Sequence, residues 1–135
     1  MNIQNGYSAM RLGDTARSVP TGNGGFGIAE HWVERIAVLT VSGDLDMLTT
    51  PELAEAIEAA ARKEPAALVV DLSRVAFLAS AGMSVLITAH RNIAPPGRFG
   101  VVANGPATSR PLKLIGIDTV VAVFRTLEDA LNRLA

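Results

Sequence analysis

The feature that most constrains the fold is a short apolar run, Ala66-Ala67-Leu68-Val69-Val70, which ends at Asp71. An uninterrupted run of this length predicts a strand buried on both faces, as in a parallel sheet. About ten residues later, apolar side chains recur at helical spacing, which predicts an amphipathic helix beginning near residues 80–82. Ser80 therefore lies at the start of a helix, among neighbours too small to cover its hydroxyl. The pattern indicates either a helix cap or a group that is reached from outside.

The remaining elements continue the alternation of strands and helices. We predict two initial strands in a tight antiparallel pair, a helix with Thr50 as N-cap, a short helix ended by Gly116 and a last helix capped by Thr126. The predicted strands are 27–32, 35–42, 68–71, 99–103 and 120–124, and the predicted helices follow Thr50, cover 81–92 and 106–114, and follow Thr126. This order predicts an α/β domain with a mainly parallel sheet of four or five strands, about four helices packed on it and right-handed crossovers.

Composition limits the classes of function. The 135 residues suffice for one domain with its own core, and 49% hydrophobic against 19% charged residues is typical of a globular chain. A formal net charge of -1 leaves no broad basic surface for nucleic acid. The absence of cysteine excludes thiol chemistry, zinc–thiolate sites and disulfides. Without a signal-like or membrane-spanning segment, we expect a soluble, cytoplasmic protein with no membrane or nucleic-acid partner.

The beginning of the chain differs from the rest. It is polar and glycine-rich without a period, so we predict a flexible N-terminal tail over residues 1–27 and a single domain over residues 28–135. Gly22, Gly24 and Gly27 spell G-x-G-x-x-G, but that nucleotide-binding motif requires a preceding strand and a following helix. Here a polar tail precedes the motif and a predicted strand follows it, which favours a linker.

Two motifs carry a resemblance to a known family. Residues 41–46, Val-Ser-Gly-Asp-Leu-Asp, followed by the helix at Thr50, resemble the G-x-L-D signature of STAS domains. Residues 69–73 and 77–86 resemble the phosphorylation-site loop of these domains, whose pattern is hydrophobic, Asp, Ser, Ser/Thr/Ala, Gly, Leu. The motifs stand in register on the expected elements, and the resemblance covers about residues 28–135. Stand-alone STAS domains of this size are typically bacterial anti-sigma factor antagonists.

The resemblance implies a partner-switching regulator and not an enzyme. In such systems an anti-sigma factor with a kinase-like ATPase fold binds either a sigma factor or the dephosphorylated antagonist, so capture by the antagonist frees the sigma factor. By motif, Ser80 corresponds to the phospho-acceptor, Gly82 to the turn after it and Asp46 to the acidic residue facing it, and a serine phosphatase would reverse the modification. The residues implied at the partner surface are Asp46, Met47, Ala79, Ala81, Gly82 and Met83.

Other interpretations of these residues stay open. Ser80 is also compatible with an ordinary N-cap, whose loss costs about 1 kcal/mol and does nothing else. Ala79 stands where the family usually has Asp, which is also compatible with a kinase-inactive partner. Asp44 and Asp46 are compatible with a magnesium site, but we favour a turn for Asp44 and a mixed turn-and-contact role for Asp46.

The remaining candidates give no signal for catalysis or metal binding. His31 and His90 have no third ligand at metal-site spacing, so we expect neither a metal nor a cofactor, and we expect His90 to be packed or half-buried. Trp32 is most simply a core or interface residue. Residues 78–82 do not reproduce the G-x-S-x-G elbow of hydrolases. The alternative function is a STAS-type sensor module that binds a nucleotide or another small ligand between strand ends and helix starts.

Overall fold

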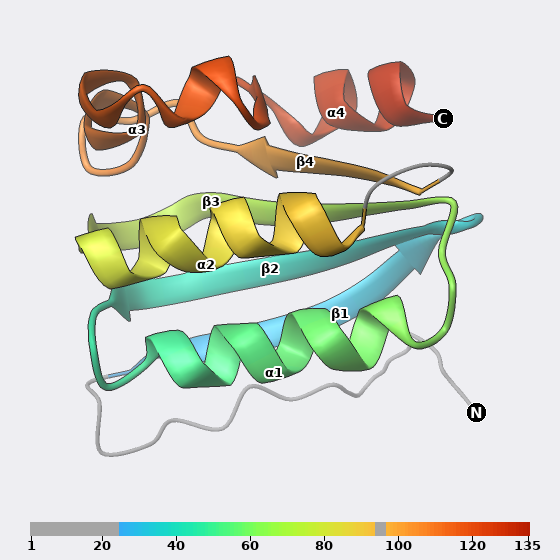
Figure 1. Ribbon diagram of the computed structural model, residues 1–135, viewed down its shortest axis with the longest axis horizontal. Coiled ribbons are helices and arrows are strands. Elements are labelled where there is room, and N and C mark those ends of the chain that lie inside the picture. Colours follow the sequence, from blue (N-terminus) through green and yellow to red (C-terminus); the bar gives the residue numbers. More distant parts are fainter. Residues whose placement is uncertain (1–24, 94–96) are drawn as a thin grey trace.

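Five strands lie side by side in the order of the chain, β1-β2-β3-β4-β5 (Figure 1). The computed structural model describes residues 25–93 and 97–135. The strands are β1 (Gly27–Val33), β2 (Ile36–Leu45), β3 (Ala67–Leu78), β4 (Arg98–Val102) and β5 (Ala122–Phe124). The helices are α1 (Thr50–Ala61), α2 (Ser80–Asn92), α3 (Ser109–Ile115), the 3₁₀ helix η1 (Ile117–Thr119) and α4 (Leu127–Leu134). The first pair of strands is antiparallel and the others are parallel, which confirms the predicted class and element order.

The helices cover the two faces of the sheet unequally. On one face α1 and α2 lie next to each other (Figure 1), and Leu112 of α3 and Ile117 of η1 complete the same large core. On the other face α4 packs against β3, β4 and β5 and closes a smaller core. Leu68 of β3 belongs to the larger core and Val69 to the smaller one. This double burial is the physical reason for the uninterrupted apolar run.

Several boundaries differ from the predicted ones. β2 and β3 continue to Leu45 and Leu78, because they stay paired through two register shifts around residues 40–44. The last strand begins only at Ala122, since η1 and a turn occupy the preceding residues. α3 begins at Ser109, after a turn in which the N–H groups of residues 108 and 109 both donate to the Gly105 carbonyl.

The start of the folded domain also differs from the prediction. Phe26, which falls within the predicted tail, is only 1% exposed, and Gly27 opens β1, as the predicted strand 27–32 does. Gly43 of β2 faces Phe26 with a φ of +95°, and a Cβ at this position would lie 2.9 Å from the Phe26 Cα. A larger residue is therefore excluded both by conformation and by space. The predicted flexibility of residues 1–24, with Gly22 and Gly24 of the glycine motif, lies outside the described residues.

Candidate functional site

The two loops singled out in the sequence lie next to each other at the carboxyl ends of β2 and β3. The strands run parallel to their ends, with Leu45 beside Leu78. The Ala79 N–H then donates to the Leu45 carbonyl at 2.9 Å. The loop of residues 46–49 leads into α1, while Ser80 begins α2, so both helices start from the same edge of the sheet (Figure 1). Parallel pairing thus brings together two segments that are about 30 residues apart.

Asp46 organises the loop that precedes α1. Its Oδ1 accepts hydrogen bonds from the N–H groups of Leu48 at 2.9 Å and Thr49 at 3.1 Å, while its carbonyl accepts the Thr50 N–H at 2.9 Å. A carboxylate that accepts main-chain N–H groups two and three residues ahead is a turn-forming residue. Asp44, for which the sequence favoured a turn, is exposed, and it takes part in this loop through its main-chain carbonyl, which accepts a hydrogen bond from the Thr49 hydroxyl. The turn role therefore belongs to Asp46.

Two adjacent threonines at the start of α1 have different surroundings. Thr49, and not Thr50, is the N-cap residue of the helix. The Thr49 Oγ1 accepts from the Asp46 N–H at 2.9 Å and donates to the Asp44 carbonyl at 2.7 Å, so it closes the loop in both directions. The Thr50 Oγ1 is buried without a hydrogen-bond partner. The sequence reasoning missed Thr49. Its reciprocal bonds with Asp46 have the three-residue spacing of a capping box, but they precede α1 and do not cap it.

Ser80 is exposed at the first residue of α2. The N-cap is Ala79, with extended backbone (φ -85°, ψ 167°) and no side-chain cap. The interpretation of Ser80 as an ordinary N-cap is therefore wrong. The N–H groups of Gly82 and Met83 donate to the Ala79 carbonyl, whereas within the described part of the chain those of Ser80 and Ala81 have no acceptor. Such free N–H groups at a helix start favour an anion.

Beneath the start of α2, the buried side chains at this edge of the sheet are apolar and closely packed. A Cβ on Gly82 would lie 2.9 Å from the Leu78 Cδ1 and 3.4 Å from the Leu45 Cβ. Gly82 and Met83 are both buried, so these two predicted partner-binding residues shape the surface from beneath. Ala79 and Ala81 are half-buried, and their small side chains do not project beyond the Ser80 hydroxyl that they flank.

An exposed apolar pair borders the same edge. Met47 is 80% exposed and Leu48, which the sequence reasoning did not single out, is 73% exposed. Both lie on the loop held by Asp46. Large apolar side chains that project together from a rigid loop are typical of a protein-contact surface.

The histidines and the tryptophan lie elsewhere. His31, half-buried on β1, has its pKa lowered by desolvation, and the nearby Asp71 carboxylate opposes that shift. His90 is half-buried, as predicted. Trp32 is 37% exposed and donates to Glu30 at 2.8 Å, so it is a surface residue of the edge strand and not a core residue. The described residues contain no group of three or more His, Asp or Glu able to hold a metal ion.

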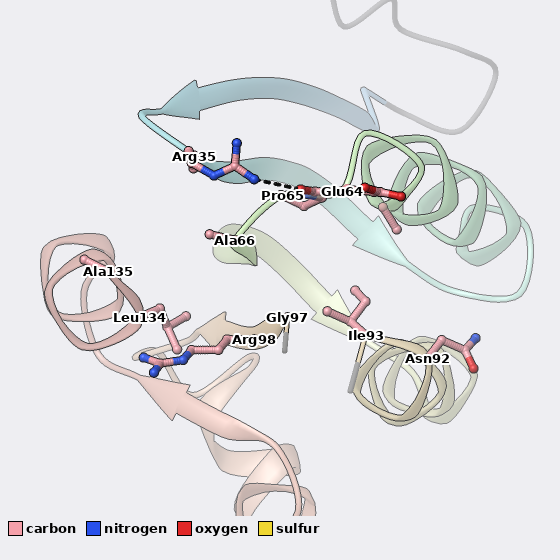
Figure 2. Close-up of a pocket in the computed structure, with 11 residues that line it drawn as sticks. Arg35, Glu64, Pro65, Ala66, Asn92, Ile93, Gly97, Arg98, Leu134 and Ala135 are labelled. Atoms are coloured by element: carbon pink, nitrogen blue, oxygen red, sulfur yellow. Dashed lines mark hydrogen bonds between the residues drawn. The ribbon is translucent and has the colours of Figure 1, made fainter. Parts of the chain in front are cut away.

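A cavity of about 670 Å³ lies at the opposite end of the sheet, where β2, β3 and β4 begin (Figure 2). Arg35 donates to the Glu64 carbonyl at 3.2 Å, and Arg98 approaches the Arg133 carbonyl at 3.5 Å. These arginines satisfy carbonyls near the ends of α1 and α4, as cationic side chains at helix C-termini often do. Their guanidinium groups also point in different directions (Figure 2). The cavity therefore lacks the convergent polar groups of a ligand site.

Comparisons with known proteins agree with this geometry. A family model described as "Mlab, STAS domain" matches residues 28–126. The anti-sigma-F factor antagonist RsfB of Mycobacterium tuberculosis is 42% identical over 105 residues, which cover 78% of this chain and 84% of that protein. The crystal structure of an anti-sigma factor antagonist from Mycobacterium paratuberculosis superposes with a TM-score of 0.80 at 38% identity, covering 86% of this chain and 98% of the other. SpoIIAA in its unphosphorylated form, at 20% identity, shares the fold with a TM-score of 0.67, covering 80% of this chain and 96% of its own.

Proposed function

This chain belongs to the STAS-domain family of anti-sigma factor antagonists, and from that premise we propose that it binds an anti-sigma factor through the edge carrying Ser80 and Asp46. The family consists of non-enzymatic regulators, so binding itself is the activity. Occupation of the anti-sigma factor releases the sigma factor that it holds. The observation that carries the proposal is the exposed Ser80 hydroxyl, set in a low surface beside the exposed Met47 and Leu48.

The surface around Ser80 suits close protein contact. Met47 and Leu48 offer apolar area to a partner, and the small side chains of Ala79 and Ala81 allow the partner backbone to approach the start of α2. Burial of apolar area contributes about 25 cal/mol for each Å² removed from water. The Asp46 carboxylate holds the loop in one conformation, which lowers the entropy lost on binding.

Phosphorylation of Ser80 would switch this contact off. A phosphate adds about -1.5 to -2 charges and three acceptor oxygens. In the free protein the unpaired N–H groups of Ser80 and Ala81 favour that charge, so the domain stays folded. In the complex the same charge has to be desolvated next to Asp44 and Asp46. A coupling of about 1–3 kcal/mol weakens the partner's affinity by roughly 5- to 150-fold.

The rest of the switch is what membership of this family implies. We propose that the partner has a kinase-like ATPase fold and supplies the phosphate, that a serine phosphatase removes it, and that the exchange takes place in the cytoplasm. Within residues 25–93 and 97–135, no helix is both long and apolar enough to cross a bilayer.

The test compares three variants in calorimetric titrations with the anti-sigma factor. Ser80→Ala should bind at least as tightly as the unmodified protein, because it removes only the hydroxyl. Ser80→Glu should fold normally but bind roughly 5- to 150-fold more weakly, because it places a carboxylate in the interface. Ser84→Glu is the matched control, since Ser84 is exposed one turn later on the same helix.

Two results would contradict the switch. Binding by both Ser80→Ala and Ser80→Glu that equals that of the parent protein would place Ser80 outside the interface, whereas equally weakened binding by both would assign a direct hydrogen bond to the hydroxyl. Intact-mass analysis after incubation with the partner and ATP tests the modification itself: a phosphate that still arrives on Ser80→Ala would assign the acceptor to another residue.

Asp46 can be tested separately for its charge and its turn. Asp46→Asn keeps an oxygen acceptor for the Leu48 and Thr49 N–H groups, whereas Asp46→Ala removes it. If the charge contacts the partner, Asp46→Asn should weaken binding with little change in the urea midpoint, while Asp46→Ala should lower both. If Asp46→Asn binds like the parent protein, Asp46 serves only the turn.

A further inference from the structure

The sheet narrows to two strands at the end that carries Ser80. Pairing of β4 with β3 stops at Asp71, and pairing of β1 with β2 stops at Ser42. β2 and β3 stay paired with each other beyond these points, so β3 runs on past the end of β4 (Figure 1). We call residues 43–45 and 75–78 the terminal ribbon. Within the described residues, this ribbon borders no third strand.

The two faces of the terminal ribbon have different surroundings. Val75 and Leu78 face the larger core, beneath α1 and α2. Phe77 belongs to neither core of the described residues and is 54% exposed, so it lies on the opposite face. α4 covers that face only farther back, where Ala67 and Val69 of β3 enter the smaller core. At about 3.3 Å for each residue, Val69 lies about 26 Å before Phe77 along the strand.

The neighbours of Phe77 on this face are polar. Asp44 lies directly opposite it on β2. Arg74 pairs with Ser42, two residues before Asp44, and therefore lies on the same face. Asp44 and Arg74 are both exposed. An apolar centre with a polar rim is typical of a protein-contact surface, and aromatic residues are enriched among those that contribute most to binding.

Phe77 is too small to hold a partner alone. A buried aromatic side chain removes about 150–250 Å² from water, whereas a stable contact needs about 800 Å² from each partner. More apolar area lies at the same end of the sheet, where Met47 and Leu48 are largely exposed beside Ser80. The surface of Phe77 is thus continuous with the edge proposed to bind the anti-sigma factor. This continuity favours the anti-sigma factor as its occupant, because a second copy of the chain would compete for the same edge.

We propose that the anti-sigma factor contacts the terminal ribbon on both faces, with Phe77 inserted into an apolar pocket of the partner. The inference rests on the proposed function and adds a contact on the face of the sheet opposite to α2. The pocket should have a cationic group near its rim, facing Asp44. Because Phe77 stands on paired backbone, little main-chain freedom is lost when it binds.

The test is calorimetric titration of the full chain with the purified anti-sigma factor. Phe77→Ala should weaken binding about tenfold or more, because it removes the aromatic anchor. Phe77→Tyr keeps the ring and should bind like the parent protein. Trp32→Ala is the matched control, since Trp32 is also an exposed aromatic residue but lies at the other end of the sheet. The urea midpoint of Phe77→Ala should equal that of the parent, because Phe77 belongs to neither described core.

The outcomes separate this inference from the proposed function. If Phe77→Ala binds like the parent while Ser80→Glu binds weakly, the inference is overturned and the proposed function stands. Parent-like binding by both variants would refute the proposed edge and the inference together. Equal losses in Phe77→Ala and Trp32→Ala, or a lower urea midpoint in Phe77→Ala, would assign the effect to folding and overturn the inference. So would a dimer of the free protein that Phe77→Ala dissociates, because the surface would then belong to a second copy.

Discussion

The adjacent threonines at the start of α1 should respond in opposite ways to the same substitution. Thr49 is 1% exposed, and its hydroxyl bonds to the Asp46 N–H at 2.9 Å and the Asp44 carbonyl at 2.7 Å. Valine has the same shape but leaves that donor and that acceptor without a partner. An unsatisfied buried polar group costs about 1–3 kcal/mol, so Thr49→Val should lower the free energy of unfolding by about 2 kcal/mol.

Thr50→Val is the matched control. The Thr50 hydroxyl is buried without a partner, and the residue is 7% exposed. Replacing this hydroxyl by a methyl group removes an unpaired polar atom from the core. The change should therefore be neutral or stabilise the fold by up to about 1 kcal/mol.

Urea unfolding followed by far-UV circular dichroism measures both variants. With a slope of about 1–3 kcal/mol per molar urea, Thr49→Val should lower the midpoint by about 1 M without changing the slope. An equal loss in both variants would assign the effect to packing of the threonine side chains. An unchanged midpoint for Thr49→Val would show that the two hydrogen bonds contribute no net stability, and the account of this loop would be wrong.

The remaining predictions concern the rest of the domain. Deletion of residues 1–24 should leave Tm nearly unchanged, and a large fall in Tm would mean that the segment packs on the domain. Phe26→Ala should lower the free energy of unfolding, measured by chemical denaturation, by about 3–5 kcal/mol, because Phe26 is 1% exposed. Ala79→Asp should supply the missing cap of α2 and raise stability by about 1 kcal/mol, which thermal melts can detect, and an unchanged Tm would contradict it. Burial lowers the pKa of His31 in the folded state below 6.5, so its contribution to stability is present above pH 6.5 and is lost as the pH falls, when the unfolded chain binds the proton first. His31→Gln should flatten this part of the Tm–pH curve, and an unchanged curve would assign the pH dependence to other groups.

The sequence predicted the ends of those elements that are determined by capping residues close by in the chain. Thr126 caps α4 by accepting the Asp129 N–H at 3.0 Å, and Gly116 ends α3 with a φ of +86°. The end of β3 could not be predicted in this way. Its pairing with β4 stops at Asp71, while pairing with β2 continues to Leu78. Beyond Asp71 the strand borders only one neighbour, so exposed residues such as Phe77 interrupt the apolar pattern although the backbone stays paired.

The candidate site was only partly accessible from the sequence. The resemblance placed Asp46 and Ser80 at one edge, but periodicity alone does not reveal which strands are neighbours. Propensity also cannot choose between Thr49 and Thr50 as the N-cap, since both are good cap residues. Thr49 holds that position without a side-chain bond to the helix, because its hydroxyl bonds back to residues 44 and 46. The cap at Ala79 carries no sequence signal at all, because alanine is a poor cap residue.

The unequal covering of the sheet has a consequence for biosynthesis. Each strand pairs with the next one made, so the larger core can close on the ribosome as successive units emerge. The smaller core has to wait for α4, the last helix of the chain, which lies beside β4 near the C-terminus (Figure 1). Until then Val69 and Val102 form part of an apolar surface that is exposed to water and accessible to chaperones. A premature stop that removes residues 127–135 would leave this face permanently open, so that a nearly complete regulator would be prone to aggregate.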